Sequence, residues 1–177
     1  MNTTMGTTTT APMTDVNSRA LAYLRIGVGV FFLIFGQYKV FGTQFTLGGG
    51  FQSWINRFLA DGAYPFMVPV LRDFVLPHGT AIAFLVAYGE LAIGLALVLG
   101  LLVRPASICG GVFMLALLFS SNYPGPTAAF WQYFGASLSH SVFLLCVVAF
   151  VVGRSDVVLS IQPRLRRWIG ASGLTSA

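Results

Sequence analysis

Glu90 stands alone in the apolar stretch AFLVAYGELAIGLALVLGLL, residues 83–102, more than ten positions from the nearest charged residue on either side. Insertion scales put the cost of a charged side chain at the centre of a membrane helix at about 2.5–3.5 kcal/mol. The carboxylate must therefore pair with a cation or face a polar cavity. Lys39 and His140 are the candidates to share such a site, since an ammonium binds anions or carbonyl oxygens and an imidazole exchanges protons near neutral pH.

Two interpretations of this group remain open. Lys39 and Glu90 could form a structural ion pair that sets the register of two helices, or they could line a small catalytic site together with His140. A histidine taken alone is more often a hydrogen-bonded core residue. Arg25 and Arg104 form a second group near the expected cytoplasmic boundary of the membrane. Arginines at such a boundary act as surface anchors or bind an anionic cofactor or substrate.

The composition identifies the elements that must position these residues. The chain has 177 residues, of which 56% are hydrophobic and only 8% charged, whereas soluble domains have roughly a quarter charged residues. We therefore expect an all-α integral membrane protein that forms one compact domain, because helices satisfy their own backbone hydrogen bonds in lipid. A spanning helix needs about 20 apolar residues. Four stretches qualify, at about residues 20–41, 79–103, 105–121 and 133–152.

Helix geometry brings the three ionisable residues together. At about 1.5 Å per residue, Glu90 on the second helix and His140 on the fourth lie at nearly the same depth. Lys39 lies on the antiparallel first helix, about 8–9 Å nearer the outer side. Helical side chains lean toward their own N-terminus, so Lys39 and Glu90 lean toward each other. The sequence therefore predicts a contact between Lys39 and Glu90, with His140 at the same level.

Small residues mark the faces on which the first two helices should meet. Each stripe contains an ionisable residue and at least one glycine, which allows close helix approach. The stripe on the first helix comprises Arg25, Gly29, Phe32, Gly36 and Lys39, and that on the second comprises Ala83, Ala87, Glu90, Gly94 and Leu97.

A short amphipathic helix is expected between the first and second spans, at residues 51–59. Its apolar residues fall at helical spacing, and three glycines precede it. They are Phe51, Trp54, Ile55, Phe58 and Leu59. Such a helix lies on the outer membrane surface or covers the mouth of the bundle.

The two ends of the chain differ from the membrane part, residues 19–153. Residues 1–18 are rich in threonine and indicate a disordered cytoplasmic tail, and residues 154–177 indicate a basic cytoplasmic tail. Both termini are placed in the cytoplasm because arginines gather at that side of the helices. That side carries Arg19, Arg25, Arg104, Arg154, Arg164, Arg166 and Arg167, against Lys39, Arg57 and Arg72 on the other.

Charge and cysteine content narrow the possible partners. The net charge is +5, and the basic residues lie mainly at the helix ends, which indicates contact with anionic lipid headgroups and not with nucleic acid.

Cys109 and Cys146 lie inside apolar helices without a CxxC motif, which is typical of small core residues, although a redox pair remains an alternative. His78 and His140 do not have the pattern of a haem pair, and no metal site is predicted.

Several short motifs resemble the DoxX/DoxD family of small bacterial membrane proteins over about residues 19–153. They are the segments LRIGVGVFFLIFGQYKVFG and GELAIGLALVLGLLVRPAS, which include Arg25, Gly36, Lys39, Gly89, Glu90 and Arg104. The resemblance implies a four-helix bundle in the bacterial inner membrane.

The resemblance also implies an activity. DoxD-type subunits of thiosulfate:quinone oxidoreductase oxidise thiosulfate to tetrathionate and reduce quinone together with a partner subunit. Lys39 would then bind a carbonyl or an anionic sulfur substrate, and Glu90 or His140 would pass protons. Two other functions remain open: a non-catalytic scaffold or assembly subunit, alone or as a homo-oligomer, and a pathway for a small solute or protons.

Overall fold

All regular secondary structure in the described part of the chain is helical. A computed structural model describes residues 11–135, 137–153, 155–163, 165 and 167. The long helices are α1 (Ala11–Phe41), α5 (Gly79–Leu99), α6 (Val103–Ser120) and α8 (Leu138–Val152). Shorter elements are α2 (Thr43–Thr46), α3 (Gly50–Asp61), α4 (Met67–Pro69), the π-helical segment η1 (Val70–Val75) and α7 (Gln132–Gly135).

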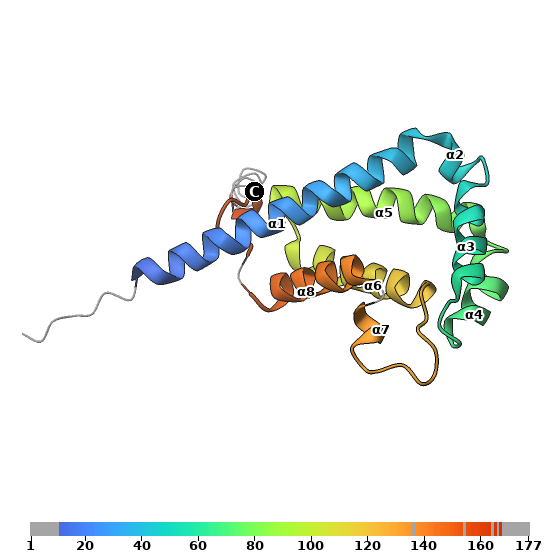
Figure 1. Ribbon diagram of the computed structural model, residues 1–177. Helices are drawn as coiled ribbons and strands as arrows, with labels where there is room; N and C mark the ends of the chain where they lie inside the picture. The colour runs from blue at the N-terminus through green and yellow to red at the C-terminus, as the bar shows by residue number, and fades with distance from the viewer. Residues whose placement is uncertain (1–10, 136, 154, 164, 166, 168–177) are drawn as a thin grey trace, which may run out of the picture.

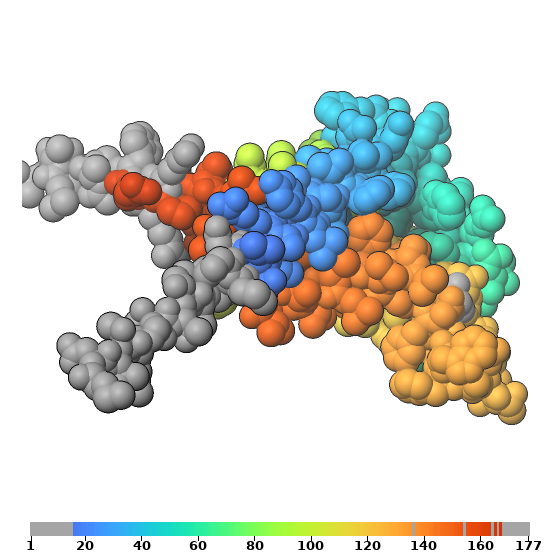
Figure 2. All heavy atoms as spheres, turned by 60° about the vertical axis from the view of Figure 1, so that its left-hand side comes forward, coloured from blue at the N-terminus to red at the C-terminus, as the bar shows by residue number. Residues whose placement is uncertain are grey.

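The four long helices pack as two antiparallel layers, with α1 against α5 and α6 against α8 (Figure 1). Helix α8 also lies beside α1, and the two share one face of the molecule (Figure 2). Buried apolar side chains from all four helices fill the space between the layers, among them Phe32, Leu97, Met114, Val147 and Phe150. The core therefore joins the predicted spans into one bundle.

Among the described residues, three helices are long and apolar enough to cross a membrane: Val16–Phe41 within α1, together with α5 and α6. Helix α8 is apolar but has only 15 residues. The fourth predicted segment, 133–152, is divided because helix α7 ends at Gly135 and α8 begins only at Leu138. Ser137, the residue before α8, has a non-helical backbone and caps no amide with its side chain.

Helix α1 begins eight residues before the expected membrane boundary, so residues 11–18 of the predicted disordered tail are helical. Pro12 does not oppose this start, because a proline in the first turn removes no intrahelical hydrogen bond. Residues 1–10 of that tail lie outside the described residues.

The segment after α8 packs back onto the bundle. The Ile161 amide donates to the Leu99 carbonyl at 3.0 Å, and the Ser160 hydroxyl donates to the Gly100 carbonyl at 2.6 Å. Gly100 ends α5 with a left-handed backbone, φ 68°, which a glycine adopts without strain. The first part of the predicted basic tail is thus anchored to the α5–α6 turn, and most of the remainder lies outside the described residues.

Helices α1 and α5 approach closely along the two predicted small-residue stripes. A Cβ atom on Gly29 would lie 2.9 Å from the Val98 amide nitrogen and 3.0 Å from the Gly94 carbonyl oxygen. One on Gly36 would lie 2.9 Å from the Leu91 amide nitrogen. These neighbours are backbone atoms that cannot rotate away, so a side chain at either glycine would separate the helices.

Helix α3 runs across one end of the bundle (Figure 1). It contains the predicted helix at residues 51–59, and it buries Phe51 and Ile55 against Leu71 and Ala83. Trp54, from the same predicted apolar face, is half exposed. A helix is thus present at residues 51–59, and its role as an amphipathic helix on the outer side of a membrane stays a prediction.

The close approach predicts a difference between two glycines on α1. Gly29→Ala should destabilise the protein by roughly 1–3 kcal/mol, because the added methyl group meets backbone atoms of α5. Gly27→Ala is the matched control: Gly27 is exposed with no atom near its Cβ position, and the change should stay within about 0.5 kcal/mol. Unfolding of the purified protein in detergent measures both. Equal stabilities would contradict the proposed packing.

Candidate functional site

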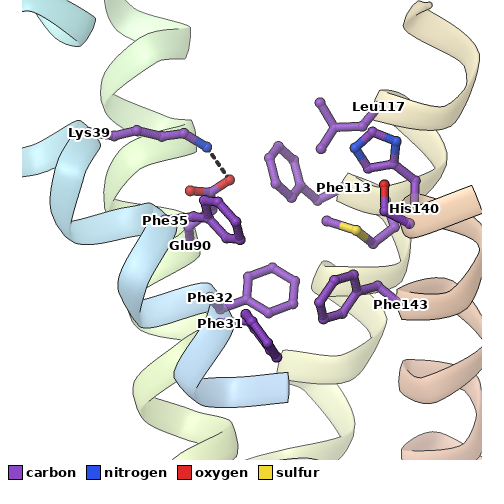
Figure 3. A pocket seen from close by; sticks show the side chains of 11 residues that line it. Phe31, Phe32, Phe35, Lys39, Glu90, Phe113, Leu117, His140 and Phe143 are labelled. Atoms are coloured by element: carbon purple, nitrogen blue, oxygen red, sulfur yellow. Dashed lines mark hydrogen bonds and ion pairs between the residues drawn. The ribbon is translucent and has the colours of Figure 1, made fainter. Parts of the chain in front are cut away.

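The predicted contact between Lys39 and Glu90 is present. The Lys39 ammonium lies 2.5 Å from Glu90 Oε1, and the two side chains point toward each other from α1 and α5 (Figure 3). Glu90 is only 4% exposed, so its charge is removed from solvent. Lys39 lies in the last turn of α1, where the helix dipole also favours a cation.

One of the two oxygens of the Glu90 carboxylate takes no part in the contact with Lys39. Glu90 Oε2 is buried, and no hydrogen-bond partner for it occurs among the described residues. His140 Nδ1, on α8, is also buried, and it too has no hydrogen-bond partner among the described residues. Native proteins rarely leave buried polar atoms unpaired, and such atoms at one place indicate a missing ligand or water. Lys39 adds unused donors, because an ammonium has three N–H groups.

These polar groups line a cavity of about 240 Å³ between α1, α5, α6 and α8. His140 lies across it from the ion pair, and phenylalanine rings form much of the wall (Figure 3). The predicted meeting of Lys39, Glu90 and His140 is therefore found at one cavity. The complete lining comprises Phe31, Phe32, Phe35, Lys39, Glu90, Phe113, Met114, Leu117, Ser139, His140 and Phe143.

A second, larger cavity of about 490 Å³ lies between α3, η1, α1, α5 and α6. It adjoins the first, since Phe35, Lys39, Phe113 and Leu117 line both. The Lys39 ammonium is 5.7 Å from the centroid of the Phe113 ring and 5.4 Å from that of Phe45, within the range of cation–π attraction. Lys39 therefore stands where the two cavities meet.

Arg25 and Arg104, the second predicted group, differ in environment. Arg25 is fully buried, and its guanidinium donates to the carbonyls of Ser155 at 2.8 Å and Leu159 at 2.6 Å. Arg104 is exposed. Arg25 thus joins α1 to the segment that follows α8, and binding of an anion or cofactor by either arginine stays a prediction.

The cysteines do not both behave as core residues. Cys146 is partly buried and Cys109 is exposed, and neither forms a disulfide. The core prediction was wrong for Cys109, because an apolar helix without a polar face does not reveal from its sequence which side it buries. In the part of the chain that the structure describes, no group of three His, Cys, Asp or Glu side chains could hold a metal ion.

A cluster of three tyrosines, Tyr64, Tyr123 and Tyr133, lies at the α3 end of the bundle. The Tyr64 hydroxyl donates to the Tyr133 carbonyl at 2.7 Å, and the Tyr64 ring packs against those of Tyr123 and Tyr133. Burial raises the pKa of Tyr64, and the nearby Tyr133 and Tyr123 raise it further. Backbone hydrogen bonds from Tyr64 to Phe119 and from Tyr123 to Gly62 fix the same region. The cluster holds the loops at this end together.

Comparison with known proteins identifies the family. The sequence model of the DoxX family matches residues 20–122, more than half of the chain, and this chain belongs to that family. The match includes Lys39 and Glu90 but ends before His140. No curated protein and no solved structure matches the chain.

A double-mutant cycle tests the ion pair. Glu90→Ala should destabilise the protein by about 3–5 kcal/mol, because it leaves the Lys39 ammonium without its counter-charge. Lys39→Met combined with Glu90→Leu should recover much of that loss, since two apolar side chains replace two charges. Unfolding in detergent gives each stability. A double variant as unstable as the sum of its two single variants, Lys39→Met and Glu90→Leu, would contradict the pairing.

Proposed function

We propose that this DoxX family protein is a quinone-linked membrane redox subunit that binds a quinone headgroup in the cavity beside the Lys39–Glu90 pair. The observation that carries the proposal is the pair of unpartnered buried atoms, Glu90 Oε2 and His140 Nδ1, on residues that line one aromatic cavity. Ligand pockets combine an apolar wall with a few convergent polar groups, as here.

The cavity suits a flat, apolar ring with two carbonyl oxygens. Phe32, Phe113 and Phe143 offer aromatic surface on which a ring can pack. Lys39 keeps N–H groups free to donate to one carbonyl, because only one contact with Glu90 uses them. His140 lies across the cavity from Lys39 (Figure 3). In the tautomer that carries its proton on the buried Nδ1, the imidazole can donate to the other carbonyl oxygen.

The same residues can move the protons that the chemistry requires. A quinone bound there would take up two electrons and two protons to become a quinol. A protonated His140 imidazole would deliver one proton, and Glu90, which is ionised beside Lys39, would relay the other after taking it up from outside the cavity. Lys39 would stabilise negative charge on the carbonyl oxygen that receives it. The electrons come from the partner subunit, where two thiosulfate anions join through one new S–S bond and release two electrons.

A non-catalytic scaffold is the second candidate, favoured by the fact that Lys39 and Glu90 already satisfy each other at 2.5 Å. In that case the pair fixes the register of α1 and α5, and the cavity is filled by lipid. The two candidates differ in one measurable property, which is specific binding of a quinone.

The quinone assignment predicts a loss of binding without a loss of fold. Lys39→Met combined with Glu90→Leu should weaken quinone binding about tenfold or more, since hydrogen bonds to charged groups contribute about 1.5–3 kcal/mol each. Tyr88→Phe is the control, because Tyr88 is exposed on α5 and lines neither cavity.

The measurement is solvent extraction of the purified proteins followed by titration with a short-chain quinone. The double variant should contain no co-purified quinone, whereas the control should retain it. Equal quinone affinity in the double variant and the control would overturn the proposal.

The proposal includes a membrane arrangement. Helices α1, α5, α6 and α8 span the bacterial inner membrane, with α3 on the outer side and both termini in the cytoplasm. The arginine asymmetry of the sequence supports this orientation. The 15 residues of α8 cover about 22 Å of a hydrocarbon layer about 30 Å thick, a mismatch that local thinning of the bilayer accommodates.

Cysteine labelling of intact cells tests the arrangement, after Cys109 and Cys146 are replaced by serine. Asn56→Cys on α3 and Thr127→Cys between α6 and α7 should react with a membrane-impermeant reagent, because both positions are exposed and lie on the proposed outer side. Leu102→Cys, exposed in the α5–α6 turn, should react only after the membrane is broken. The opposite pattern would reverse the orientation.

A further inference from the structure

The larger cavity beneath α3 has no role in the proposed chemistry. Its volume of about 490 Å³ exceeds that of the headgroup cavity and falls in the range of pockets that hold small molecules, about 300–1,000 Å³. Most of its wall is apolar, including Phe45, Phe51, Ile55, Leu71, Ile82 and Val86. Protein interiors are otherwise close-packed, so an apolar space of this size is suited to an apolar occupant.

The position of this cavity relative to Lys39 indicates what that occupant is. The two cavities share Phe35, Lys39, Phe113 and Leu117, so a molecule that contacts Lys39 from the headgroup cavity can continue into the larger one. Glu90 and His140 line only the smaller cavity, and the unpartnered polar atoms Glu90 Oε2 and His140 Nδ1 therefore belong to that side alone. Both cavities have mainly apolar walls, but only the smaller one carries Glu90 and His140, and Lys39 lines both.

We infer that the cavity beneath α3 holds the isoprenoid tail of the same quinone whose headgroup lies beside Lys39, Glu90 and His140. This inference rests on the proposed function. The tail passes Phe113 and Lys39 and lies against α3, which covers the end of the bundle (Figure 1). It follows that α3 is part of the binding site, and that the protein distinguishes quinones by their tails as well as by their rings.

Two neighbouring residues on α5 give a matched test. Val86 lines the tail cavity and not the headgroup cavity, whereas Leu85 is 73% exposed and lines neither. Val86→Trp places a large side chain in the path of the tail, and Leu85→Trp adds the same side chain on the outer surface. The probes are one quinone with a single isoprene unit and the same headgroup with a long isoprenoid tail, titrated in the same detergent.

Val86→Trp should weaken binding of the long-tailed quinone by about tenfold, because the indole takes up space that the tail would fill. Binding of the short-tailed quinone should be unchanged, and Leu85→Trp should change neither. Unchanged binding of the long-tailed quinone to Val86→Trp, or an equal loss for both probes, would overturn the inference. If neither probe binds the unmodified protein, the proposed function fails instead.

A second measurement uses the unmodified protein and does not depend on the folding of a variant. A quinone with a photoreactive group near the end of its tail should label residues of α3 or η1, and an excess of unlabelled long-tailed quinone should prevent this. Labelling confined to the exposed faces of α5 or α8, at Leu85 or Val142 for example, would show that the tail lies in lipid and would overturn the inference. If α3 is labelled and excess unlabelled quinone does not prevent the labelling, the cavity holds a lipid chain, and this result would also overturn the inference.

Discussion

The structure depends on an ion pair between a buried carboxylate, Glu90, and a partly exposed ammonium, Lys39. Glu90 occupies the middle of α5, where most neighbouring side chains are apolar, and Lys39 compensates its charge from α1. A pair of this kind forms only if the two helices come close and stay in register. The glycines at positions 29, 36 and 94 allow that approach, because a Cβ atom at any of them would meet backbone atoms of the opposite helix. Packing and electrostatics therefore impose the same arrangement of α1 and α5.

Helix α1 is held by a cation near each end of its packed region. Lys39 binds a side chain on α5, whereas Arg25 binds backbone carbonyls of residues 155 and 159. The two residues are 14 positions apart, which corresponds to about 21 Å along the helix. Two nitrogens of Arg25 donate to main-chain oxygens, so Arg25 ties the segment after α8 to the bundle through the backbone of that segment. Lys39 instead has a carboxylate partner, and the second oxygen of that carboxylate faces no partner among the described residues.

Sequence reasoning located the ion pair because depth and face follow from helix periodicity alone. Glu90 was the only carboxylate in the four predicted spans, and Arg25, Lys39 and His140 were the only candidate partners there, so few pairings were available. The partners of Arg25 could not be found in this way, because they are carbonyls, which every residue has, in a segment that resembled a tail. The cavities were equally hidden, since Phe31, Phe32 and Phe35 on α1 all line one of them while differing in exposure. An apolar helix such as α8, with no polar face, gives little indication of where it begins or which side it buries.

The position of Lys39 makes the two cavities interdependent. Its ammonium contacts Glu90 and lies near the rings of Phe45 and Phe113. Phe45 belongs to the wall of the larger cavity, and Phe113 lines both. Attraction of a cation to an aromatic ring is strongest where water is excluded, so these rings and the carboxylate act together on the ammonium. A group in either cavity can therefore contact the Lys39 side chain, and a molecule long enough to enter both can contact it on two sides. One ion pair thus sets the helix register and also places a cation where the two cavities meet.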